Sequence, residues 1–304
     1  MFKNFVSKVM TFIFCVTMLL VPKVNVSAAT TLAPGKDDIV QKTVTKINEY
    51  DAYKHYISLS DAELLESGFS KDDITYLRNL DFKAELKKRA NLPTSQLIEL
   101  GYSDREISKL RTYDGSDNIQ PYAATGLLTS NLYKASPTQF KVMFNWSWSS
   151  CPVFIRTDII AVVWSASNSS ALNMNAAIDK SQTNTYHNIT YYDTYSGKYT
   201  TDKRPFDINH EYAGASSSFS LGYNYGDGYM RWAPKGGGQI TINAPEGPIY
   251  ELLMRFEYGH TYVTGTPSFK ISGSGPSIGI SFNATTKTED FSSHRYRSNG
   301  QTVS

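Results

Sequence analysis

The chain has 304 residues, with 30 lysines and arginines, 28 aspartates and glutamates and a formal net charge of +2. This near-neutral balance argues against a nucleic-acid partner, because proteins that bind nucleic acids neutralise phosphates with a basic excess. Its two cysteines are Cys15 and Cys151, and the first lies in a segment predicted below to be removed. We therefore expect no intramolecular disulfide.

An export signal is predicted at the start of the chain. Residues 1–8 carry two lysines and no acid, and the thirteen residues 9–21 carry no charge. Small residues follow at positions 27–29, as signal peptidase requires. Thirteen residues span only about 20 Å as a helix, short of a hydrocarbon core of about 30 Å. We therefore predict that residues 1–29 are a cleaved signal peptide and that the protein is secreted.

The next region, residues 30–118, has a helical pattern and an internal repeat. Residues 59–78 and 92–111 share the pattern L-x-E-x-G-[FY]-S-x-x-[DE]-I-x-x-L-R at an offset of 33 residues. In each unit the glycine suits a helix end, and the serine with the following acid forms a capping box. Two helix-turn-helix hairpins are therefore predicted. The region holds 13 basic and 16 acidic residues, which favours a prodomain, spacer or partner-binding module over a DNA-reading helix pair.

The composition changes at residue 119. Beyond Ile119 lie 28 of the 40 aromatic residues, including all four tryptophans. Residues 140–148 alternate between apolar and polar, which predicts a half-buried strand, and the continuous apolar run 159–164 predicts a central one. Further strands are expected over 191–199, 219–229, 239–243, 250–258 and 262–269. The predicted fold is α+β in two parts, with an all-β antiparallel sandwich over residues 119–304 after the helical region.

A hydrolase is one alternative function. Ser277 stands in a G-x-S-x-G motif, and Asp290 and His294 follow in the order that α/β-hydrolases use. That motif works on a strand-to-helix turn above a parallel sheet. The residues around Ser277 instead alternate as a strand, so we predict no catalytic residues.

Histidine and cysteine residues raise two further functions, metal binding and thiol chemistry. Asp207, His210 and Glu211 form the densest polar cluster, but no H-E-x-x-H motif accompanies them. Three histidines on separate strands could still converge on zinc, although hydrogen-bonded or solvated histidines are favoured. Cys151 would need a histidine base that the sequence does not place, so a buried structural thiol is favoured. No metal site and no cofactor are predicted.

Two tyrosine-rich hairpins form the candidate binding surface. Tyrosine and tryptophan on a strand face can stack on sugars or anchor at membrane interfaces. Half of the set is expected in the core and the remainder on a contact surface. The candidates are Tyr191, Tyr192, Tyr195, Tyr223, Tyr225, Tyr229 and Trp232.

Residues 270–288 form another unusual stretch. They contain no acid and place isoleucines among serine, glycine and threonine, and a Gly-rich centre at 272–276 divides them into two arms. Such a hairpin can add to a sheet edge, or it can enter a bilayer as part of an oligomeric barrel. We favour the edge hairpin.

The layout of the chain resembles that of secreted Gram-positive large bacteriocins of the geobacillin and closticin types. The features that carry this resemblance are the repeated units, the segment Phe144-Asn145-Trp146-Ser147-Trp148 and a Ser/Gly-rich tail. This resemblance implies an exported antibacterial protein whose C-terminal portion could be released from an N-terminal proregion. The tail from Tyr223 holds 7 basic and 6 acidic residues, which departs from a cationic membrane-active peptide.

We therefore expect a secreted, non-enzymatic antibacterial or toxin-like protein that acts at a bacterial cell envelope, on its membrane or on a surface glycan. The alternatives are a secreted glycan- or cell-surface-binding β-sandwich and a secreted hydrolase. The sequence assigns no oligomeric state.

Overall fold

The computed structural model describes residues 39–297, apart from 169–173, 212, 227, 264–266, 273–277 and 283–285. The predicted signal peptide and Ser277 lie outside the described residues. Within the described part of the chain, none of the helices combines the length and the apolar character needed to cross a membrane.

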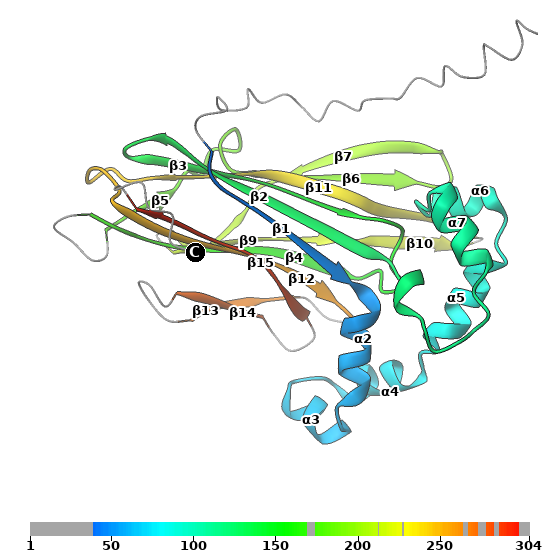
Figure 1. The fold of residues 1–304 in the computed structure, drawn as a ribbon. Coiled ribbons are helices and arrows are strands. Elements are labelled where there is room, and N and C mark those ends of the chain that lie inside the picture. Colours follow the sequence, from blue (N-terminus) through cyan, green and yellow to red (C-terminus); the bar gives the residue numbers. More distant parts are fainter. Residues whose placement is uncertain are drawn as a thin grey trace, which may run out of the picture. The chain divides into compact units, whose positions relative to one another are not determined.

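The strands form two large antiparallel sheets and a small one (Figure 1). The first sheet runs, by hydrogen-bonded neighbours, through β1 (Ile39–Asn48), β2 (Thr125–Ser136), β3 (Gln139–Trp148), β11 (Tyr229–Asn243), β6 (Tyr186–Asp193) and β7 (Lys198–Arg204). The strands β5 (Ala177–Ile178) and β10 (Gly222–Gly226) also pair with β11. The second sheet runs through β15 (Thr286–Arg297), β12 (Glu251–Thr261), β4 (Thr157–Ser167), β9 (Gly214–Ser220) and β8 (Asp207–His210). The small sheet pairs β13 (Phe269–Ser272) with β14 (Gly279–Phe282).

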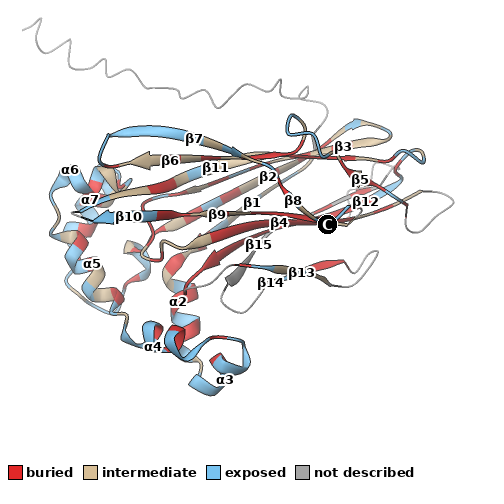
Figure 2. Ribbon diagram, turned by 180° about the vertical axis from the view of Figure 1, so that it is seen from behind, coloured by how far each residue is buried: buried red, intermediate tan, exposed pale blue. Residues whose placement is uncertain are grey.

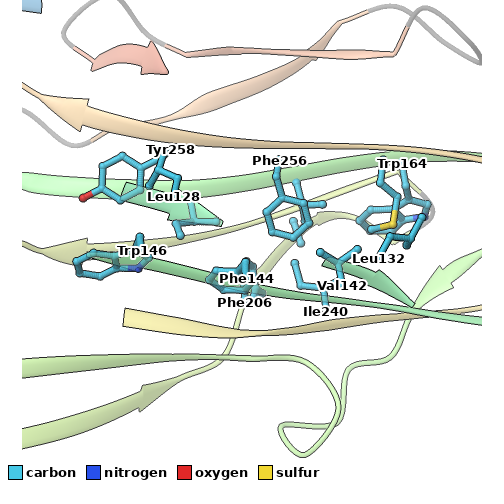
Figure 3. Close-up of a cluster of buried hydrophobic side chains, with 14 of the residues drawn as sticks. Leu128, Leu132, Val142, Phe144, Trp146, Trp164, Phe206, Ile240, Phe256 and Tyr258 are labelled. Carbon is cyan, nitrogen blue, oxygen red and sulfur yellow. The ribbon is translucent and has the colours of Figure 1, made fainter. Parts of the chain in front are cut away.

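The hydrophobic core lies between the two large sheets (Figure 3). Phe144 on β3 and Phe256 on β12 have ring centroids 5.4 Å apart, and the rings of Trp146 and Tyr258 are 5.8 Å apart. Each fully buried side chain of this size contributes about 1.5–3 kcal/mol to folding. The predicted alternation is confirmed, because the five residues expected to face the core are all buried: Phe140, Val142, Phe144, Trp146 and Trp148.

The apolar run at 159–164 lies in β4, between β9 and β12 in the middle of the second sheet. The prediction of a central strand here is confirmed. Both faces of β4 are covered, because Val163 on the outer face packs with Ile278 next to the β13–β14 hairpin. Among the described residues this hairpin pairs with no strand of the large sheets. The prediction that residues 270–288 form a hairpin at a sheet edge is therefore wrong. The strand predicted over 262–269 is also wrong, because β13 begins at Phe269.

A series of short helices follows β1 and gathers at one end of the sheets (Figure 1). They are α2 (Glu49–Ser58), α3 (Asp61–Glu66), α4 (Lys71–Asn79), α5 (Phe82–Ala90), α6 (Thr94–Glu99), α7 (Asp104–Arg111) and a 3-10 turn at Gln120–Tyr122. The strands on either side of them are neighbours, since Asn48 at the end of β1 pairs with Thr125 at the start of β2. The helices therefore form an insertion between two paired strands.

The helical region predicted over residues 30–118 contains a strand that the sequence pattern did not indicate. Residues 39–48 form β1, which pairs with β2 along most of its length. β-Branched side chains favour strands. Six of these ten residues are β-branched: Ile39, Val40, Thr43, Val44, Thr45 and Ile47. The charged residues nearby concealed this signal.

The helices repeat the same local contacts along the chain. Capping boxes join Ser70 to Asp73 at the start of α4 and Ser103 to Glu106 at the start of α7. The arginines that close the two units, Arg78 and Arg111, each donate to two backbone carbonyls located 21 and 19 residues earlier. Equivalent residues of the two units therefore make equivalent hydrogen bonds.

Candidate functional site

Exposed tyrosines gather near the turns of the β6–β7 and β10–β11 hairpins. Strand pairing brings these ends together, because Asp193 and Tyr223 both lie opposite Arg231 on β11. Strand pairing places Tyr192 and Tyr199 on the face of the sheet that carries Trp232, and Tyr223 on the opposite face with Arg231. We define the tyrosine surface, which spans both faces of these hairpin ends, as Tyr192, Tyr195, Tyr199, Tyr223, Tyr225 and Tyr229. Apart from the half-buried Tyr192, these residues are 43–74% exposed. Figure 2 shows the exposed lengths of β7 and β10 at the end of the sheets where α6 and α7 lie.

The rings of the tyrosine surface hold one another in place. They form three pairs, Tyr192 with Tyr199, Tyr195 with Tyr229 and Tyr223 with Tyr225, with centroids 4.8, 5.1 and 5.0 Å apart. The last two pairs meet edge to face, at 84° and 89°, a geometry that aromatic quadrupoles favour. The rings are thus ordered before any ligand arrives.

Charged groups fix the hydroxyls of two of these tyrosines, Tyr223 and Tyr225. Tyr225 donates to Asp193 at 3.2 Å and to the Tyr223 hydroxyl at 3.3 Å, and Arg231 donates to Tyr223 at 3.4 Å. The hydrogen bond from Arg231 lowers the pKa of Tyr223, whereas the hydrogen bond to Tyr223 raises the pKa of Tyr225 to about 12. Arg231 is itself paired with Asp202 at 3.4 Å.

The seven residues predicted for the binding surface differ in solvent exposure. Tyr195, Tyr223, Tyr225 and Tyr229 are exposed, and Tyr192 is half-buried. The remaining two, Tyr191 and Trp232, are buried. Tyr199 was not among the predicted residues, although it lies opposite Tyr192 in the hairpin.

Tyr191 and Trp232 do not belong to the surface, because they are 2% and 1% exposed. Tyr191 lies within β6 on its inner side and donates to the Ser220 carbonyl at 2.9 Å. Trp232 is covered by the end of α6, where its Nε1 donates to the Glu99 carbonyl at 3.0 Å. Contact with a distant helix cannot be seen in a strand pattern.

The glycine after α6 permits this contact. Gly101 has φ of +84°, and a Cβ atom at this position would lie 2.8 Å from the Trp232 ring. The helical insertion therefore packs against the strand that also carries Tyr229 and Arg231.

Two of the histidines that were considered for catalysis or metal binding are fully buried and hydrogen-bonded. The Nε2 atom of His187 accepts from Trp146 at 2.9 Å, and its Nδ1 atom lies 3.0 Å from the Ser217 hydroxyl. Burial lowers the pKa of His187 to about 3, which keeps the imidazole neutral. His294 lies 2.8 Å from the Ser130 hydroxyl, and burial lowers its pKa to about 4. Among the described residues, the hydrogen-bond partner of His294 is therefore a buried serine.

His260 belongs to a buried charge network. Its Nδ1 atom is 3.0 Å from Asp158, which also accepts from the Tyr258 hydroxyl at 2.6 Å. Glu49, the first residue of α2, has Oε1 4.0 Å from His260 Nε2 and accepts from the backbone N–H of Phe154 at 2.7 Å. The network thus connects the helical insertion to the second sheet.

The polar cluster noted on the sequence does not close around an ion. Asp207 and His210 are exposed on β8, and Glu211 pairs with Lys180 at 3.1 Å. In the described residues there is no group of three or more His, Cys, Asp or Glu side chains arranged to hold a metal. Cys151 is buried, and burial raises the pKa of its thiol to about 12.

Comparisons with known proteins add no family. No protein-family model and no curated protein matches the chain. The solved structure of AvmM, which catalyses macrocyclization in alchivemycin A biosynthesis, is 10% identical, with coverage of 56% of this chain and 87% of that chain and a TM-score of 0.25. The structure of manganese lipoxygenase of Gaeumannomyces graminis with part of the zonadhesin of Komagataella pastoris is 9% identical, with coverage of 58% and 64% and a TM-score of 0.20. Scores this low carry no argument about this chain.

Proposed function

We propose that this is an exported, non-enzymatic protein that binds a bacterial cell envelope through the tyrosine surface. One observation carries the proposal: five tyrosines that are 43–74% exposed gather at one end of the first sheet. Exposed aromatic side chains that gather in one region mark interaction sites, whereas exposed side chains scattered singly are ordinary. Antibacterial action is the consequence that the resemblance to large Gram-positive bacteriocins implies.

A binding role fits the polar residues better than catalysis does. His187, His260 and His294 each have no more than 1% of their surface exposed, and each is hydrogen-bonded to a neighbouring side chain. These three rings are buried among the described residues. The tyrosines of the tyrosine surface are instead exposed, and their rings are paired.

We also propose a two-part architecture for this binding protein, with a helical repeat region carried by a β-sandwich. The recurring capping boxes and arginine contacts support two helix-turn-helix units. Because β1 precedes the helices and pairs with β2, removal of the N-terminal region would strip an edge strand from the first sheet. The region therefore stays attached in the active protein.

Co-sedimentation with envelopes isolated from Gram-positive bacteria tests the proposal. The purified protein should sediment with the envelopes, and a variant with Tyr195→Ala, Tyr199→Ala and Tyr229→Ala should remain in solution. The matched control is Tyr250→Ala, which removes a tyrosine that is 41% exposed beside the end of β4. Absence of sedimentation by the unaltered protein would overturn the proposed function. Equal sedimentation of the triple variant would overturn the assigned surface.

Growth assays and intact mass complete the test. The unaltered protein should inhibit related bacteria, and the triple variant should do so less. The mass of the protein recovered from culture medium should correspond to loss of residues 1–29 alone. A mass that lacks the helical region would contradict the proposal that it stays attached.

A further inference from the structure

We infer that the β13–β14 hairpin detaches from the second sheet and inserts into a bacterial membrane, where hairpins from several copies of the chain line a pore. The inference goes beyond the proposed binding function and concerns a different part of the molecule. Three observations carry it: how the hairpin is held, how its two faces differ and how its sequence pattern continues on either side.

Side-chain packing holds the hairpin in place. Among the described residues its two strands pair only with each other. They lie beside the second sheet, on the side away from the first sheet (Figure 1). Ile271, Ile278 and Ile280 pack there with Val163 of β4 and Leu253 of β12. A two-stranded hairpin alone is at best marginally stable in water, so this packing is what keeps the hairpin folded on the sheet.

The face of the second sheet that carries Val163 is not fully apolar. Arg255 lies opposite Val163 on the neighbouring strand, so the two side chains share this face. The Nε atom of Arg255 is buried and has no hydrogen-bond partner among the described residues. An unpaired buried donor is costly, and release of the hairpin would open this face to water. The hairpin is therefore held less firmly than it would be on a fully apolar face.

The hairpin has one apolar face and one polar face. Ile271 lies opposite Ile280 on the face that packs against the second sheet. Lys270 lies opposite Ser281 on the other face, and both are exposed. Strands that line a membrane pore alternate in the same way, with apolar side chains towards the lipid and polar ones towards the water-filled interior. The face that is packed on the sheet is therefore suited to contact lipid.

The same alternation continues in the sequence beyond the two short strands. From Val263 to Ser272 every even-numbered residue is polar and no odd-numbered residue is. From Ile278 to Thr285 the even-numbered residues are apolar, and the odd-numbered ones are polar or glycine. If the pairing of residue 271 with residue 280 is extended through both segments, one face of the hairpin stays apolar along its whole length. Residues 262–288 also contain no acid.

The two segments are long enough to cross a bilayer. Residues 262–272 lie between β12 and the centre of the hairpin, and residues 278–285 lie between that centre and β15. Release of residues 286–288 from β15 would make the second segment as long as the first. A membrane-crossing strand needs about 9–11 residues. The outer edges of a single inserted hairpin would leave backbone groups unpaired in hydrocarbon, so neighbouring copies must pair with them.

A reducible disulfide tests whether the hairpin must leave the sheet. Gly214 of β9 leaves room for Ile271, because a Cβ atom at residue 214 would lie 3.2 Å from the Ile271 Cγ1 atom. The double variant Gly214→Cys, Ile271→Cys therefore brings two thiols within reach of a disulfide. The target is a dye-loaded vesicle prepared from the membranes of Gram-positive bacteria. The oxidised variant should lose dye release and regain it on reduction, whereas the unaltered protein should release dye under both conditions.

Lys270→Glu gives a second readout. Lys270 is exposed on the polar face, so it would line the pore, and charged side chains that line a pore set its ion selectivity. The substitution should shift the selectivity of the conductance from anions towards cations, measured as the reversal potential across a planar bilayer of the same lipids. Lys71→Glu is the control, because it changes an exposed lysine of the helical insertion, and it should leave the selectivity unchanged.

The outcomes separate this inference from the proposed function. Dye release by the oxidised variant at the rate of the unaltered protein would overturn the inference, as would a selectivity that Lys270→Glu does not change. Absence of dye release by the unaltered protein would also overturn it. Co-sedimentation of the same samples with isolated envelopes tests the proposed function separately, and the oxidised variant should sediment as the unaltered protein does.

Discussion

The buried pair formed by Glu49 and His260 should make stability depend on pH. The two side chains are at most 1% exposed, and Oε1 lies 4.0 Å from Nε2. Burial alone would lower the pKa of His260, but Asp158 and then Glu49 raise it from 6.5 to about 9. The charged histidine therefore stabilises the folded chain fully below about pH 6.5. This contribution is lost as the pH rises through about 9.

The size of the effect follows from the shift. A rise in pKa from 6.5 to about 9 corresponds to about 3 kcal/mol, at about 1.4 kcal/mol per unit. Glu49→Gln removes one of two carboxylates that act on His260, and it keeps an oxygen to accept from the Phe154 N–H. We expect the free energy of unfolding to fall by about 1–3 kcal/mol at about pH 6, and by less at about pH 9.5.

Urea unfolding at the two pH values measures this difference. Glu66→Gln is the control, because it removes an exposed carboxylate from the same helical insertion, and it should change stability by less than about 0.5 kcal/mol. A loss for Glu49→Gln that is equal at both pH values would refute the role assigned to His260.

Three further predictions concern the contacts between the helical insertion and the sheets. Gly101→Ala should lower the free energy of unfolding by about 3 kcal/mol, because residue 101 has φ of +84° and the new Cβ would lie 2.8 Å from the Trp232 ring. The control is Gly197→Ala, where φ is +67° but no atom lies near the new Cβ, and it should lower the free energy of unfolding by only about 1 kcal/mol. Arg89→Lys loses the guanidinium that donates to the Cys151 and Pro152 carbonyls. It should lower the free energy of unfolding, measured with urea, by about 2–4 kcal/mol. The Cys151 thiol should react with Ellman's reagent only after unfolding, and rapid native labelling would contradict its burial.

Much of the sheet was predictable because its signal is local. The alternation over residues 140–148 and the apolar run at 159–164 correspond to β3 and β4, since one or both faces of those strands lie against the core. The capping boxes at Ser70 and Ser103 were predictable for the same reason, as their partners are three residues away.

The features that were missed depend on distant parts of the chain. β1 is a strand because β2 lies beside it, although 76 residues separate the two. Trp232 is buried because α6 covers it. Asp158 and His260 are 102 residues apart, and each looks ordinary alone. The tyrosines can be found in the sequence as a set, but which of them face solvent depends on which side of β6 faces the core and on packing from α6.

The affinity of the tyrosine surface for isolated envelopes tests the central claim most directly. If each exposed ring contributes about 1 kcal/mol, the double variant Tyr195→Ala, Tyr229→Ala should raise the dissociation constant about 30-fold. Tyr250→Ala should leave it within about twofold of the unaltered protein. A double variant that binds envelopes as tightly as the unaltered protein would contradict the account.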